Sequence, residues 1–91
     1  MKCMQLRITG KVQGVWYRRW TVGQAKALGL SGWVRNRKDG SVEALVYGPA
    51  EQVDALIGAC QQGSPRSRVD AVSARPAEPD DTIGFHQRPT Y

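Results

Sequence analysis

The stretch CMQLRITGKVQGVWYRRW, residues 3–20, decides the fold because the hydrophobic pattern changes within it. Residues 3–9 alternate apolar and polar side chains, which is typical of a half-buried strand. Two glycines interrupt this pattern over residues 10–14. From Tyr17 onward, apolar and small residues recur at helical spacing until Gly29, a plausible helix end. The sequence therefore predicts a strand, a glycine-containing loop and a helix.

The remaining chain repeats this succession of elements. It predicts strands at 31–36, 41–48 and 68–75, a hairpin turn at Asp39-Gly40, a helix over 49–63, and a short strand within 83–91 anchored by Phe85. Gly23 falls inside the first helix, where we expect it to permit the close approach of another element. The order of the main elements is β-α-β-β-α-β.

This order is typical of the α+β ferredoxin-like arrangement, the split β-α-β sandwich. We expect an antiparallel sheet with two helices on one face. A length of 91 residues indicates one domain over 1–91, and no internal repeat or linker divides the chain.

The charge is distributed unevenly along the chain. Residues 1–40 carry nine Lys/Arg and one Asp, a net charge of +8, whereas residues 41–91 carry a net charge of −3. A basic first half indicates an anionic partner, such as a phosphate-bearing small molecule, a nucleic acid or an acidic protein. Charge alone, however, favours a solvated basic surface without a ligand.

The cysteines and the apolar segments indicate the cellular compartment of the protein. Cys3 and Cys60 do not form a disulfide framework or a CxxC pair, so we expect free thiols and no zinc site. No apolar run approaches the ~18 residues of a membrane helix, and the N-terminus alternates as a strand does instead of forming a signal peptide. We therefore expect a cytoplasmic protein with no membrane partner.

The glycine loop is a candidate anion site. Backbone N–H groups at a loop and a first helical turn lack partners, and the helix dipole adds partial positive charge there. Gly10 and Gly14 permit close approach to a ligand, and Arg18 can add a two-pronged donor to phosphate oxygens. The signal is weak by itself, because the loop matches neither a Walker P-loop nor GxGxxG and any strand-to-helix connection can use glycine.

Two longer motifs, however, resemble the acylphosphatase family closely. These are GKVQGVWYR, at residues 10–18, and GWVRN followed by DGSVE and a later glycine, within residues 32–48. GSPRSRVDAV and the C-terminal GFHQRPTY are also similar to that family, so the likeness spans nearly the whole chain. The resemblance implies a ferredoxin-like fold and a hydrolase that cleaves the carboxyl-phosphate bond of small acyl phosphates.

The resemblance also implies the site residues. Arg18 is the expected phosphate-binding and catalytic arginine, and Asn36 is the expected catalytic asparagine. The phosphate-binding set comprises Val12, Gln13, Gly14, Val15, Trp16, Tyr17 and Arg18. No metal and no cofactor are expected, and the expected partner is a small acyl phosphate bound by a monomer.

The chemistry fits these residues. The leaving group is a carboxylate, a weak base that departs without a proton donor, so the lone histidine, His86, need not be a catalyst. Loop amides and Arg18 can stabilise charge on the phosphoryl oxygens, while Asn36 can position a water molecule. Without the resemblance, an asparagine before a turn indicates backbone capping. Asp39 is the only carboxylate among residues 1–40 and is better explained by its turn than by a magnesium site.

Two alternatives belong to other functional classes. The RNA-recognition module shares the β-α-β-β-α-β order, but the 41–48 strand lacks its aromatic pattern and carries only Tyr47. We therefore expect no nucleic-acid partner. A non-catalytic interaction domain with a vestigial anion loop is the other alternative, and the presence of both Arg18 and Asn36 argues against it.

Overall fold

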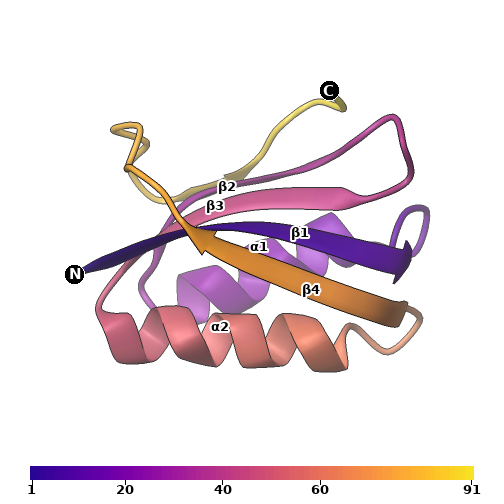
Figure 1. Cartoon of the computed structure of the whole chain (residues 1–91), viewed down its shortest axis with the longest axis horizontal. Coiled ribbons are helices and arrows are strands. Elements are labelled where there is room, and N and C mark those ends of the chain that lie inside the picture. The colour runs from indigo at the N-terminus through magenta and orange to yellow at the C-terminus, as the bar shows by residue number, and fades with distance from the viewer.

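The computed structural model describes residues 1–91 as one sheet covered by two helices. The elements are β1 (Lys2–Lys11), α1 (Tyr17–Ala27), β2 (Ser31–Asn36), β3 (Val42–Gly48), α2 (Ala50–Gln62), β4 (Arg68–Pro76) and β5 (Phe85–Gln87). Both helices lie on the same face of the sheet (Figure 1). The predicted order of elements and the ferredoxin-like α+β fold are confirmed. Neither helix has the length and apolarity that a membrane span requires.

The sheet has the strand order β4-β1-β3-β2-β5. The four long strands pair antiparallel, as predicted, but β5 pairs parallel with β2, so the sheet is mixed. After β4 the chain leaves one edge of the sheet, crosses to the opposite edge and there runs alongside β2 (Figure 1). Because of this crossing, the last strand follows β2 in the same direction.

The core lies between the sheet and the helices. Leu6 and Ile8 on β1 are fully buried, as the alternation of residues 3–9 predicts. Tyr17 on α1 and Leu56 on α2 contribute to the same cluster of buried side chains. Phe85 is 1 % exposed, which confirms its predicted role as the anchor of the C-terminal segment. The segment that joins β4 to β5 is held to the opposite face, where Trp33 Nε1 donates to Asp80 Oδ2 at 2.8 Å.

The expectation that Gly23 admits another element is wrong. A Cβ placed on Gly23 would meet no atom within 4 Å, and the residue lies in the interior of α1. Gly10 behaves differently, because a Cβ there would overlap the carbonyl oxygen of Arg68 where β1 pairs with β4. Of the two glycines, Gly10 is therefore the one that permits a close backbone approach.

We predict that Gly23→Ala stabilises the protein. Alanine restricts the unfolded chain and favours the helix, so the free energy of unfolding should rise by about 0.5–1 kcal/mol. Urea denaturation measures this change, with Gly10→Ala as a contrasting variant that should destabilise the fold. A loss of stability in Gly23→Ala would mean that α1 depends on a contact the structure does not contain.

Candidate active site

The loop between β1 and α1 is anchored in the core at both ends. Val12 and Tyr17 are each 1 % exposed, and the Tyr17 hydroxyl donates to the carbonyl of Cys60 on α2 at 2.9 Å. Burial and the neighbouring Cys60 thiol raise the pKa of Tyr17 above its ordinary value, so the phenol stays neutral. The residues between these anchors are therefore held in place by two buried side chains.

Two residues of this loop adopt left-handed backbone conformations. Gly14 has φ = 72°, and Trp16, at the N-cap of α1, has φ = 64° and ψ = 21°. Left-handed residues in a tight loop turn successive amides toward one concave side, which is a common way to build an anion site. No side chain caps the helix, and its first turn contains no acidic residue. The first-turn amides and the helix dipole are thus free to act on a bound anion.

Trp16 was not expected to adopt a left-handed conformation. A bulky residue pays a steric penalty there that glycine avoids, and sequence reasoning assigned this role to glycine alone. Trp16 is 68 % exposed, and the centroid of its ring lies 5.8 Å from the guanidinium carbon of Arg19.

Asn36 ends β2 beside this loop. Its carbonyl accepts a hydrogen bond from the backbone N–H of Tyr91 at 3.0 Å, and the Lys38 N–H donates to the Tyr91 carbonyl at 3.2 Å. The C-terminal residue therefore continues the pairing of β5 along β2 and fixes the backbone of Asn36. The side-chain Oδ1 of Asn36 is buried and has no hydrogen-bond partner. A buried acceptor without a partner is costly unless a ligand or a water molecule satisfies it.

One cavity of about 540 Å³ brings the predicted catalytic residues together. Its walls comprise Val12, Gly14, Trp16, Tyr17, Arg18, Arg19, Asn36 and Gln87. Arg18 and Asn36, which lie far apart in the sequence, thus share one cavity. Gln87 comes from β5, and sequence reasoning missed it because the pairing of β5 with β2 could not be read from the chain.

Gln13 and Val15 of the predicted phosphate-binding set do not line this cavity. The side-chain Nε2 of Gln13 donates to the carbonyls of Arg37 and Ser41, at 2.7 and 2.8 Å. These two carbonyls flank the turn that follows Asn36. Gln13 therefore ties the loop to the turn with its side chain, and only its backbone N–H remains a candidate phosphate donor.

Charge in the cavity comes from arginine alone. Arg18 forms no ion pair, and no carboxylate lines the cavity. Asp39 accepts hydrogen bonds at Oδ1 from the hydroxyl and N–H of Ser41, at 2.6 and 2.9 Å, and these bonds lower its pKa. Asp39 therefore stabilises the turn, as predicted. Nowhere do three or more His, Cys, Asp or Glu side chains gather as a metal site requires.

His86 lies away from the cavity. It is exposed on β5, and its Nε2 lies 2.7 Å from the carbonyl oxygen of Ile83. His86 is therefore a surface residue of the sheet.

Comparison with known proteins bears directly on this site. The family model described as Acylphosphatase matches residues 4–87. A protein named acylphosphatase from Rhodospirillum rubrum is 56 % identical over 99 % of both chains, and one from Rhizorhabdus wittichii is 54 % identical over 94 % of this chain and 87 % of its own. The crystal structure of acylphosphatase from Bacillus subtilis superposes with a TM-score of 0.92 at 32 % identity, covering 97 % of this chain and 99 % of that one. The chain therefore belongs to the acylphosphatase family and is a hydrolase of small acyl phosphates.

Proposed function

We propose that the 540 Å³ cavity is the catalytic site, in which Arg18 and the loop amides bind the phosphoryl group and Asn36 positions the attacking water. The observation that carries this proposal is the buried, unpartnered Oδ1 of Asn36 in the same cavity as the unpaired guanidinium of Arg18. The attacking water would donate the hydrogen bond that Asn36 Oδ1 lacks, and the acyl phosphate would supply the anion that Arg18 lacks.

Arg18 is the second residue of α1, so its guanidinium and the amides of the helix start come from adjacent positions. The phosphoryl group carries charge on three equatorial oxygens in the transition state, and fixed donors stabilise that charge without reorganising. A guanidinium is always charged and can contact two oxygens at once. Arg18 and the amides together therefore supply the positive charge, and no step of the reaction requires a metal ion or a cofactor.

The amide of Asn36 can orient a water molecule without titrating. Its Oδ1 accepts a hydrogen bond from the water, which points an oxygen lone pair toward the phosphorus. Tyr91 and the hairpin turn fix the Asn36 backbone, so the amide is placed before substrate arrives. The water's proton passes to a phosphate oxygen, and the carboxylate leaves without a general acid because it is a weak base.

We further propose that one chain, folded as a single domain over residues 1–91, performs the reaction as a monomer. Both proposals are supported by the construction of the site, since the β1–α1 loop, α1, β2 and β5 of one chain supply every wall of the cavity. A nucleic-acid partner is not favoured, because Tyr47, the aromatic residue of β3, directs its hydroxyl to the carbonyl of Thr82. The crossing segment is thus held to Tyr47, where a stacked base would need access.

A chelator experiment tests the proposed function. The purified protein should release phosphate from acetyl phosphate at the same rate with and without EDTA. Inorganic phosphate should inhibit competitively, because the loop recognises the tetrahedral anion itself. If activity vanishes in EDTA and returns with magnesium, the assignment of charge stabilisation to Arg18 and the amides is wrong. Noncompetitive inhibition by phosphate would contradict the placement of the phosphoryl group in this cavity.

A further inference from the structure

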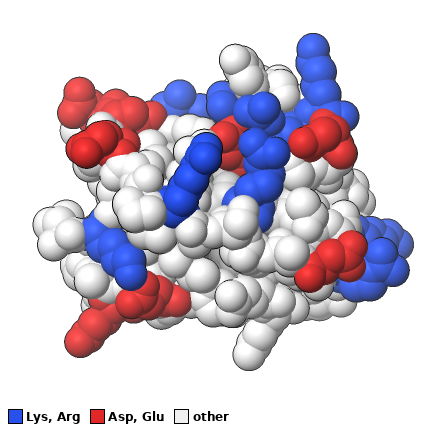
Figure 2. Space-filling view, viewed as in Figure 1, with Lys and Arg blue, Asp and Glu red and all other residues white.

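Arginine side chains gather on the sheet face opposite the helices. Figure 2 shows blue side chains in the middle and upper part of this view, with acidic side chains mainly toward its edges. Glu43 lies at the centre of this cluster and is 3 % exposed. Its Oε1 accepts from Arg35 Nε at 2.7 Å and from Arg37 Nη1 at 3.1 Å, while Oε2 accepts from Gln5. Burial alone would raise the pKa of Glu43, but the hydrogen bonds from Arg35 and Gln5 lower it overall.

Arg7 and Arg75 lie beside this group, but neither donates a hydrogen bond to a buried carboxylate as Arg35 and Arg37 do. Arg7 Nη1 reaches only the exposed Asp39, at 3.4 Å, and its Nε is buried with no hydrogen-bond partner. Arg75 pairs with no acidic residue, and its Nη2 donates to Gln5 Oε1 at 3.3 Å. Arg75 therefore has no compensating carboxylate, and Arg7 has a single long ion pair with an exposed one.

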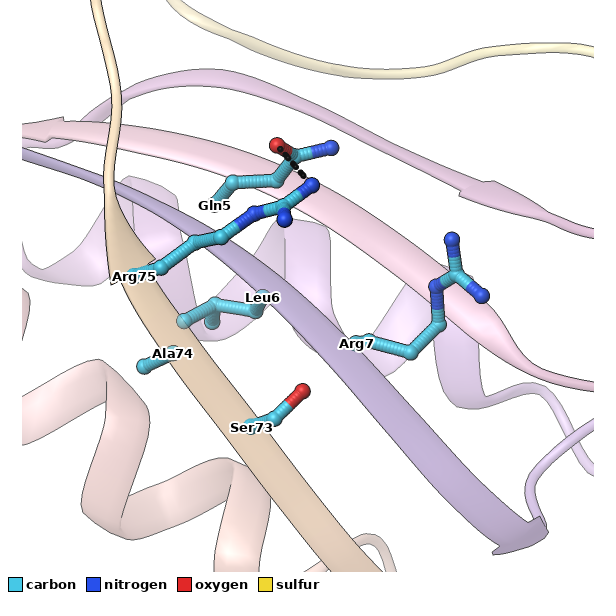
Figure 3. A pocket seen from close by; sticks show the side chains of 6 residues that line it. All are labelled: Gln5, Leu6, Arg7, Ser73, Ala74 and Arg75. Atoms are coloured by element: carbon cyan, nitrogen blue, oxygen red, sulfur yellow. Dashed lines mark hydrogen bonds between the residues drawn. The ribbon is translucent and has the colours of Figure 1, made fainter.

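Both arginines line one pocket of about 250 Å³ between β1 and β4 (Figure 3). In the strand register Gln5 lies opposite Arg75 and Arg7 lies opposite Ser73, so four polar side chains occupy the corners of one patch. Diagonal neighbours on such a patch are about 7–8 Å apart at their backbones, within the reach of two long side chains. Leu6 and Ala74 complete the lining, and no carboxylate belongs to it.

The pocket is organised before any ligand arrives. Gln5 Nε2 donates a hydrogen bond to Glu43. This bond orients the Gln5 amide so that its Oε1 accepts a hydrogen bond from Arg75. The hydroxyl of Ser73 forms no hydrogen bond within the protein and faces the same pocket. Two guanidinium groups and one hydroxyl, on neighbouring strands, thus offer donors from different directions. A tetrahedral oxyanion carries acceptors in several directions, whereas a carboxylate carries two oxygens in one plane.

We propose that this pocket is a second oxyanion site, which takes a phosphate group and is separate from the catalytic cavity. The two pockets share no lining residue, so the proposal does not depend on the roles of Arg18 and Asn36. A phosphate dianion offsets the unpaired charge of Arg75, adds to the single long ion pair of Arg7 and supplies acceptors to Ser73. The phosphate group comes either from inorganic phosphate, the reaction product, or from an intact acyl phosphate.

An NMR titration at constant ionic strength tests the proposal. Inorganic phosphate should shift the amide signals of Gln5, Arg7, Ser73 and Arg75 along one saturable curve, and those of Gly14 and Tyr17 along another. Arg75→Gln should weaken the first curve at least tenfold, because it removes a charge-assisted donor, and leave the second unchanged. Arg68→Gln is the matched control, since Arg68 is an exposed arginine of β4 outside the pocket, and should change neither curve.

Further ligands identify the source of the phosphate group. Saturation of the same signals by acetylphosphonate, which is not hydrolysed, extends the site to the substrate's phosphoryl group, and saturation by inorganic phosphate alone restricts it to the product. Equal saturation by acetate would overturn the assignment to phosphate. Linear shifts that sodium chloride reproduces, or an undiminished curve in Arg75→Gln, would overturn the site itself. Failure of the catalytic proposal would instead appear in the signals of Gly14 and Tyr17.

Discussion

Arg18→Ala is expected to lower kcat/KM for acetyl phosphate by about a thousandfold, in the range seen when a charge-stabilising arginine is removed from a phosphoryl-transfer site. The variant also loses charge-assisted hydrogen bonds to the phosphate ground state. Its affinity for inorganic phosphate should therefore fall about tenfold or more. Calorimetry with phosphate and steady-state kinetics with acetyl phosphate measure the two effects separately.

Two further variants test whether the loss is specific to the Arg18 guanidinium. Arg18→Lys keeps the charge but loses the planar fork, so it should recover part of the phosphate affinity and little of the turnover. Lys26→Ala removes a positive charge from the exposed last turn of the same helix and should leave both quantities unchanged. Equal losses in Lys26→Ala and Arg18→Ala would mean that the basic surface steers the substrate and that Arg18 has no specific role.

The fold was predictable because its elements follow simple periodicities. Residues 3–9 alternate, and the chain from Tyr17 to Ala27 carries a helical stripe, so local spacing indicates both the type of each element and the face that it buries. The pairing of β5 was not predictable in the same way. Three residues carry no clear pattern, and their parallel direction follows from the path of the segment between β4 and β5.

The candidate site was likewise predictable only in part. The motifs indicated Arg18, Asn36 and the loop, because those residue types recur with their spacing in a known family. The sequence could not indicate that the Gln13 side chain bonds two carbonyls of the hairpin turn, or that Tyr91 pairs with the Asn36 backbone. These contacts join segments that are distant in the chain. They hold the parts of the site at fixed positions, on which catalysis by proximity depends.

Asn36 should affect turnover and leave phosphate binding nearly intact. If its amide only orients water, Asn36→Ala should lower kcat by on the order of a hundredfold or more, as expected for one positioned polar group. The affinity for inorganic phosphate should stay close to that of the unchanged protein, since phosphate binding does not use the attacking water. Such a loss is expressed in the transition state and not in ground-state binding. Weak phosphate binding in Asn36→Ala would instead place Asn36 among the phosphate ligands.

Asn36→Asp distinguishes positioning from proton abstraction. A carboxylate is a better base than an amide, so a general-base role predicts that this variant keeps or raises the activity. The positioning role predicts a loss at least as large as that of Asn36→Ala, because the new charge repels the phosphoryl group and the amide donor is gone. The buried environment of Oδ1 strengthens the repulsion, since a charge near the cavity is poorly screened there. Kinetics with acetyl phosphate at neutral pH decide between the roles, and near-normal turnover in Asn36→Asp would exclude the positioning role.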